Sequence, residues 1–178
     1  MTRPGDDAGV AGVSARTAVI VESLVTPAAA AAARARLAAA GYARYPRIDL
    51  GSYQACVAPD EPDLVAAAAR AVEPSVGFPV VAEQVRAWWL GPGDYVLAHH
   101  DPPGRFGLVE VVVDLSPAPA AAEVHYRRRG QLYFVMPAVP GTAAIVERGP
   151  AVTSNHTYLS HRGPAAHVVR LIIGFVPR

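Results

Sequence analysis

A histidine and an aspartate two positions apart end the segment from Tyr95 to Asp101, which reads as a β-strand. Because side chains on a strand alternate between its two faces, His99 and Asp101 point to the same side and can reach the same atom. Pro102 favours extended geometry for Asp101, which keeps that side chain in register with the strand. The pair alone fits chance as well as it fits a binding site, so the rest of the chain has to be considered.

An arginine in the middle of an apolar strand is the second unusual feature. Arg170 interrupts the run from Val168 to Phe175. Burying a guanidinium group without a partner is costly, so we expect Arg170 to meet a carboxylate. That carboxylate belongs either to a bound ligand or, in a purely structural role, to Glu110 or Asp114.

The composition excludes several kinds of chemistry. All 16 basic residues are arginine, so neither a lysine Schiff base nor a P-loop is possible. The single cysteine, Cys56, rules out an intrachain disulfide and a zinc site built on several thiolates. A formal net charge of +1 argues against a nucleic-acid partner, and the arginines at 127–129 read as a solvated turn. Without a long apolar segment, we expect a cytoplasmic protein that does not enter a membrane.

The 178 residues, 52% of them hydrophobic, suit one compact domain. We expect a loose tail over residues 1–16 and one domain over 17–178, with helical support over about 17–80 and a β core over about 81–177. One helix is predicted over 28–40, after Thr26-Pro27 and before Gly41, and another over 61–72, capped by Asp60. Short strands separated by Gly and Pro are predicted over 84–90, 94–101, 107–115, 122–128, 131–137, 142–147 and 166–176, with an extended piece near 156–161.

The order and spacing of four residues, His99, Asp101, His161 and Arg170, resemble the Fe(II)- and 2-oxoglutarate-dependent dioxygenases, in particular the branch similar to prolyl 4-hydroxylases. The resemblance covers about residues 85–175. It implies a mainly β protein with N-terminal helices and a double-stranded β-helix core, the jelly roll also found in cupins. It also implies that His99, Asp101 and His161 bind Fe(II), a ligand set that leaves three metal positions open. His156, 14 residues before Arg170, is the alternative to His161.

The same resemblance implies the cosubstrates and the reaction. 2-Oxoglutarate would bind the metal while Arg170 pairs with its C5 carboxylate, and O2 would take the last position. The retained Asp101 favours hydroxylation of an unactivated C–H bond, with release of succinate and CO2, and no catalytic residue is expected beyond the metal ligands. Tyr95 and Tyr133 are candidate cosubstrate contacts.

Arg86, Arg105 and His125 are candidate contacts to a small metabolite, amino acid or peptidyl substrate. Two other functions stay open: a cupin-type metalloenzyme that does not use 2-oxoglutarate, and a non-catalytic β-barrel module that binds a carboxylate.

Overall fold

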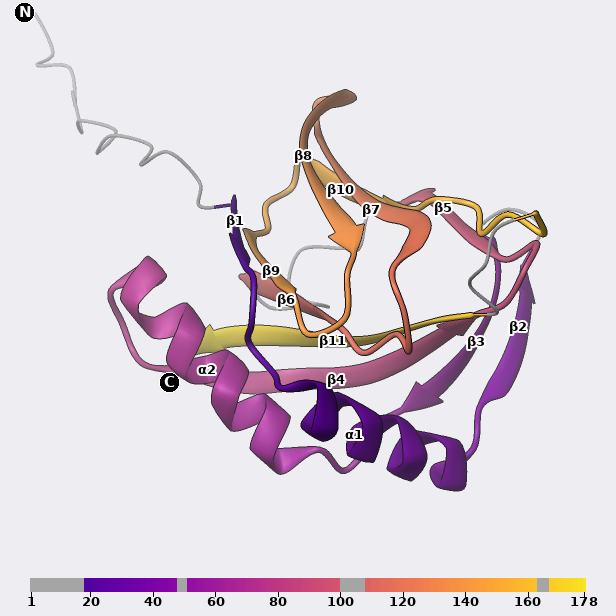
Figure 1. The fold of residues 1–178 in the computed structure, drawn as a ribbon. Coiled ribbons are helices and arrows are strands. Elements are labelled where there is room, and N and C mark those ends of the chain that lie inside the picture. The colour runs from indigo at the N-terminus through magenta and orange to yellow at the C-terminus, as the bar shows by residue number, and fades with distance from the viewer. Residues whose placement is uncertain (1–17, 48–50, 100–107, 163–166) are drawn as a thin grey trace, which may run out of the picture.

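The computed structural model describes residues 18–47, 51–99, 108–162 and 167–178, so the tail predicted over 1–16 lies outside the described residues. Two helices and eleven strands occur within these ranges (Figure 1). The helices are α1 (Pro27–Ala40) and α2 (Pro62–Val76). The strands are β1 (Ala18–Val21), β2 (Ala43–Arg47), β3 (Gly51–Val57), β4 (Val80–Leu90), β5 (Tyr95–His99), β6 (Val109–Asp114), β7 (Ala120–Arg128), β8 (Gln131–Ala138), β9 (Ala143–Glu147), β10 (Val152–His156) and β11 (Val168–Pro177).

Eight of the eleven described strands form two blocks of four that fold over one another. In the described sheet the order is β1-β9-β6-β11-β4-β3-β5-β10-β7-β8, with β2 paired to β3. The block β9-β6-β11-β4 and the block β5-β10-β7-β8 are joined through β3, which pairs with β4 and with β5. Figure 1 shows the two blocks facing each other, with both helices against the outer side of β4 and β11. This arrangement confirms the predicted double-stranded β-helix with N-terminal helices.

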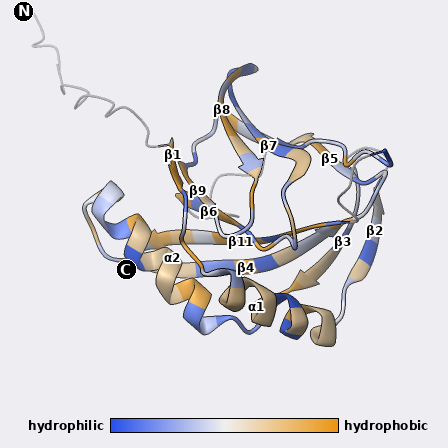
Figure 2. Ribbon diagram, in the orientation of Figure 1, coloured by the Kyte–Doolittle hydropathy of each residue, from blue (hydrophilic) through white to orange (hydrophobic). Residues whose placement is uncertain are grey.

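Two hydrophobic cores follow from the alternation of side chains along the strands. Val111 and Val113 of β6 pack toward the helices, where they meet Leu37 and Leu64. Val112 points the other way, into the space between the two blocks. Both faces of β6 and β9 are therefore covered, and the two strands consist mainly of apolar residues (Figure 2). We refer to the space between the two blocks as the barrel interior.

Both predicted helices are present. The Thr26 hydroxyl accepts a hydrogen bond from the Ala29 N–H at 3.2 Å, so α1 begins with the expected cap. For α2 the predicted cap is wrong, because Glu61 and not Asp60 occupies the cap position, and its side chain makes no capping hydrogen bond. The second helix also continues past residue 72 to Val76, and it ends where Gly77 adopts a left-handed conformation.

The strand predictions hold for most of the C-terminal half and fail elsewhere. β1, β2 and β3 lie in the region predicted to be helical support. They were not predicted as strands, because these short segments carry alanines, arginines and a proline and lack a clear alternating pattern. The extended piece predicted near 156–161 is wrong as well, since β10 ends at His156. Neither helix in the described ranges is long and apolar enough to cross a membrane.

Candidate active site

The strand that carries the predicted metal ligand His99 pairs with the strand that carries His156. β5 runs antiparallel to β10, with His99 opposite Ser154 and Val96 opposite His156. The pairing slips between Ser154 and His156, so the strand is locally irregular there. Asp101, which follows the last residue of β5 by two positions in the sequence, lies outside the described residues. The fold therefore brings the backbone of His99 beside a strand with a buried histidine.

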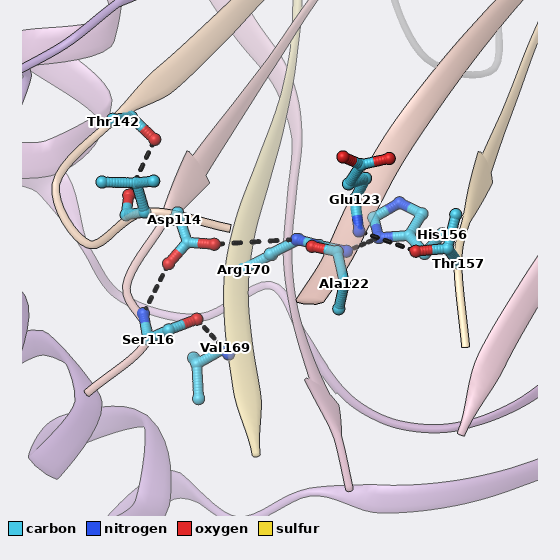
Figure 3. Close-up of polar contacts among 10 residues, drawn as sticks. Asp114, Ser116, Ala122, Glu123, Thr142, His156, Thr157, Val169 and Arg170 are labelled. Carbon is cyan, nitrogen blue, oxygen red and sulfur yellow. Dashed lines mark hydrogen bonds and ion pairs between the residues drawn. The ribbon is translucent and has the colours of Figure 1, made fainter. Parts of the chain in front are cut away.

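Arg170 is the third residue of β11 and is fully buried in the barrel interior. Its Nη1 lies 2.6 Å from Nδ1 of His156, and its Nη2 donates to the Ala122 carbonyl oxygen at 2.8 Å (Figure 3). Its Nε lies 3.9 Å from Oδ2 of Asp114. Burial lowers the pKa of the guanidinium group, and the nearby Asp114 carboxylate opposes that effect. The carboxylate expected beside Arg170 is thus Asp114, one of the two predicted structural partners.

Asp114 holds a fixed position behind the arginine. Its Oδ1 accepts a hydrogen bond from the Ser116 N–H at 2.9 Å, whereas Oδ2 has no hydrogen-bond partner among the described atoms. Ser116 in turn accepts from the Val169 N–H at 3.2 Å, which ties this loop to β11 (Figure 3). Burial raises the pKa of Asp114, and Arg170 acts in the opposite direction. Arg170 therefore lies beside a carboxylate that uses only one of its two oxygen atoms as a hydrogen-bond acceptor among the described atoms.

The structure places the two candidate distal histidines in different surroundings. His156 is buried at the end of β10, with its ring centroid 4.6 Å from that of Trp88. His161 lies on an exposed turn five residues later, with its ring 6.3 Å from that of Tyr158. The turn that carries His161 lies close to Gly93, whose N–H donates to the Leu159 carbonyl. Of the two histidines, His156 is the one in contact with Arg170.

The other predicted site residues are spread over the barrel. Tyr95 begins β5 opposite Ser52 and is half-buried. Arg86 lies on β4 with its guanidinium 4.7 Å from the centroid of the Trp88 ring. His125 on β7 is half-buried, and its Nε2 lies 2.7 Å from Oε2 of Glu123. Arg105 lies outside the described residues.

Tyr133 is half-buried on β8 beside Arg128, whose guanidinium lies 4.8 Å from the centre of its ring. Arg170 contacts the carbonyl of Ala122 on β7, whereas Tyr133 lies near Arg128, six residues further along that strand. The two groups are therefore near different ends of β7.

A buried polar network that the sequence analysis did not predict crosses the barrel interior. Glu110 accepts a hydrogen bond from the Tyr126 hydroxyl at 2.8 Å and lies 3.4 Å from Nη1 of Arg148. The same Nη1 donates to the Ser154 hydroxyl at 3.0 Å. Burial, followed by the Glu110 charge, raises the pKa of Tyr126 well above its ordinary value. Alternation along β6 was the available signal, because it puts Glu110 on the same face as Val112 and Asp114.

Comparison with known proteins identifies the fold. No protein-family model and no curated protein matches the sequence. Solved structures do match. A 2OG-Fe(II) oxygenase family oxidoreductase from Burkholderia pseudomallei aligns with a TM-score of 0.72 at 12% identity, over 89% of this chain and 84% of that chain. A Pseudomonas putida prolyl-4-hydroxylase aligns with a TM-score of 0.70 at 14% identity, over 92% of this chain and 94% of that chain.

A third similar structure is that of an epimerase and not of a hydroxylase. It is the non-heme alpha-ketoglutarate-dependent epimerase SnoN from nogalamycin biosynthesis, with a TM-score of 0.67 at 11% identity, over 89% of this chain and 76% of that chain. The chain thus has the fold of the 2OG-Fe(II) oxygenases, as the sequence resemblance predicted. At these identities the likeness establishes the fold, and the reaction has to be argued from the residues of this chain.

Proposed function

We propose that this protein is an Fe(II)- and 2-oxoglutarate-dependent oxygenase that hydroxylates an unactivated C–H bond of a small metabolite, amino acid or peptidyl substrate. The observation that carries the proposal is the position of Arg170. A fully buried guanidinium group projects into the interior of an oxygenase fold, and its Nε, 3.9 Å from Oδ2 of Asp114, makes no hydrogen bond to the described atoms. A guanidinium group that retains an unused donor in a buried site suits the carboxylate of a bound ligand.

The residues that the structure describes contain no group of three His, Cys, Asp or Glu side chains that could hold a metal, so the proposed ligand set is the one that the sequence resemblance implies. Two imidazoles and one carboxylate form a facial set that leaves open positions on Fe(II). His99 and Asp101 would supply two of the ligands from the end of β5. The distal ligand would come from His161, as the spacing predicts, or from His156. The burial of His156 and its place on the strand beside β5 support His156 as the stronger candidate.

The contact between His156 and Arg170 restricts the imidazole. A guanidinium group can only donate hydrogen bonds, so Nδ1 of His156 accepts from Nη1 of Arg170 and a neutral ring carries its proton on Nε2. Nitrogen needs a lone pair to bind a metal ion, so in this orientation neither ring nitrogen is free to do so. We therefore propose that metal binding at His156 requires this contact to break, which releases Nη1 of Arg170 for the cosubstrate carboxylate.

The other residues act on orientation and water exclusion. Arg170 would fix the C5 carboxylate of 2-oxoglutarate by charge-assisted hydrogen bonds, with Tyr95 as a predicted contributing hydroxyl. Tyr133, the other predicted contact, lies beside Arg128 near the other end of β7 and is not assigned to this carboxylate. Trp88 and Leu90, both buried toward the barrel interior, keep this end of the site dry. When bound, Fe(II), 2-oxoglutarate and O2 supply the oxidising chemistry, in which 2-oxoglutarate becomes succinate and CO2. Arg86, Arg105 and His125 remain the predicted substrate contacts.

The proposal is tested by following succinate formation from 2-oxoglutarate in air with added Fe(II). We expect slow succinate formation by the unaltered chain and none by Asp101→Ala. Of the two histidine variants, His156→Ala should lose activity, and His161→Ala should retain it if His156 is the distal ligand. Iron binding without any use of 2-oxoglutarate would favour the cupin-type alternative. Carboxylate binding without iron or oxygen consumption would favour a non-catalytic module.

A further inference from the structure

A second arginine points into the barrel interior at the end of the molecule where β5 ends. Val124 and Tyr126 of β7 are both buried in the barrel core, and alternation puts Arg128 on the same face. Across the sheet, Tyr126 of β7, Ser154 of β10 and His99 of β5 lie side by side in one row. Arg128 pairs with Val152, two residues further along β7 and β10. Arg128 therefore lies two residues from the row that contains the predicted metal ligand His99.

Arg128 lies over an aromatic ring and pairs with no acid among the described residues. Its guanidinium lies 4.8 Å from the centre of the Tyr133 ring. Its Nε and the Tyr133 hydroxyl are both buried without a hydrogen-bond partner among the described atoms. No acidic side chain in the described ranges forms an ion pair with Arg128. Buried donors that lack acceptors are uncommon in folded proteins and call for an explanation.

A β-bulge turns Tyr133 toward this arginine. β7 and β8 pair Tyr126 with Phe134 and Arg127 with Leu132, so Tyr133 is the extra residue between two pairs. Such a bulge redirects the side chain of the residue that it leaves unpaired. The hydroxyl of Tyr133 is thereby brought to the barrel interior, although regular alternation would have placed it outside. The bulge and the unpaired donors thus occur at the same place.

Among the described residues, Arg128 carries a positive charge at this end of the barrel that no acidic side chain pairs with. Arg148 and Glu110 already form an ion pair there, and Glu110 also accepts from Tyr126. Burial raises the pKa of Tyr133, and the charges of Arg128 and Arg148 oppose this rise. Tyr133 therefore remains a hydrogen-bond donor at neutral pH, beside a guanidinium group that can only donate.

We propose that Arg128 and Tyr133 bind a carboxylate group of the substrate, beside the end of β5. We call this pair the carboxylate site. A guanidinium fork matches the two oxygens of a carboxylate, whose negative charge would pair with Arg128, a cation that no described acid pairs with. The inference rests on the proposed oxygenase function for the role of the bound molecule as substrate. It goes beyond that function by specifying an acidic substrate and the two residues that select it.

The test is a calorimetric titration of the full chain, saturated with 2-oxoglutarate, with benzoate, benzamide and phenyl phosphate as probes. Benzoate should bind more tightly than benzamide. Arg128→Gln should weaken benzoate binding by about ten-fold or more, and Tyr133→Phe by roughly three-fold. Arg127→Gln is the matched control, because it removes the same charge from the adjacent residue, on the opposite face of β7, and it should leave benzoate binding unchanged.

Three outcomes would overturn the proposal: equal binding of benzoate and benzamide, an equal loss in Arg127→Gln and Arg128→Gln, or clearly tighter binding of phenyl phosphate than of benzoate. Failure of the oxygenase proposal gives a different result. Benzoate selectivity would then persist in a chain that forms no succinate, whereas a chain that forms succinate without benzoate selectivity contradicts the carboxylate site alone.

Discussion

At the scale of single residues, the barrel interior depends on the pairing of buried charges. Arg170 is fully buried, and its charge is balanced by Asp114 at 3.9 Å and by hydrogen bonds to His156 and Ala122. A buried charge that loses its partner is far more destabilising than a pair that is removed together. The same arginine is the proposed anchor of the cosubstrate. Its stabilising role and its binding role can be separated by changing the arginine and the aspartate in turn.

We predict that Arg170→Met lowers the free energy of unfolding by about 3 kcal/mol, because it leaves Asp114 without its cation. Arg170→Met combined with Asp114→Asn should recover part of that loss, since the amide carries no charge. Urea denaturation of the two variants and of the unaltered chain measures both values. Both variants should also need at least about ten-fold more 2-oxoglutarate for half-maximal succinate formation. A single variant as stable as the unaltered chain would contradict the pairing.

At the scale of secondary-structure elements, β3 positions the strand that ends in His99. β3 pairs with β4 on one side and with the start of β5 on the other. At this crossing Gly51 has a φ of +146° and lies opposite Val96, and a Cβ at that position would overlap the carbonyl oxygen of Tyr95. Only glycine allows the two backbones to approach this closely. The placement of β5 therefore depends on a residue far from it in the sequence.

Gly51→Ala should lower the free energy of unfolding by roughly 3 kcal/mol, because it adds a backbone clash to the strain of a positive φ. Gly77→Ala is the matched control. Gly77 also has a positive φ, of +78°, but nothing lies within 4 Å of an added Cβ. Strain alone should cost about 1 kcal/mol in that variant. Equal losses in thermal or chemical denaturation would show that the contact between β3 and β5 is unimportant.

The sequence predicted those elements whose pattern is local. The helix over 28–40 has a capping threonine and a terminal glycine, and β6 and β11 are rich in Val and Ile. β3 and β10 could not be recognised in this way. β10 has the sequence VTSNH, and its buried positions include the polar residues Ser154 and His156. Ser154 accepts a hydrogen bond from Arg148, and His156 accepts one from Arg170. Alternation of hydrophobic residues cannot reveal a strand that faces a polar interior.

The candidate site was predictable to a similar extent. The burial of Arg170 follows from its own strand, and Asp114 was one of the two structural partners expected for it, with Glu110 as the other; the pairing of β11 with β6 selects Asp114. The contact of Arg170 with His156, which lies 14 residues earlier on β10, depends on how β11 and β10 lie in the folded barrel. The ion pair of Glu110 and Arg148 likewise depends on tertiary contacts alone. Such contacts have no local signal in the sequence.

At the scale of the whole molecule, two layers perform different tasks. The layer between the helices and β4, β6, β9 and β11 is almost wholly apolar, whereas the barrel interior also holds Arg170, Asp114, Glu110 and Arg148. The apolar layer provides hydrophobic stabilisation, which allows the interior to retain polar groups suited to binding. The fold is shared with oxygenases of different reaction type, so the fold alone does not specify a reaction or a substrate.

Stability should also depend on pH through His167, which stacks on Trp89 at the start of β11 with ring centroids 5.5 Å apart. Burial, followed by the charge of Arg34, lowers the pKa of His167 below its ordinary value of 6.5. The folded protein then binds fewer protons at this residue than the unfolded chain, so stability is lost as the pH falls from about 6.5 through the lowered pKa. His167→Gln should reduce the loss of unfolding free energy between about pH 7.5 and pH 5. An unchanged loss would contradict this assignment.

The central claim is that this barrel binds Fe(II) and 2-oxoglutarate together, and the most direct measurement is visible absorption of the purified chain without oxygen. Addition of both Fe(II) and 2-oxoglutarate should produce a metal-to-ligand charge-transfer band that neither component produces alone. Asp101→Ala should abolish the band, and Arg170→Met should require more 2-oxoglutarate to reach the same intensity. A folded chain that gives no band at saturating concentrations of both components would contradict the account.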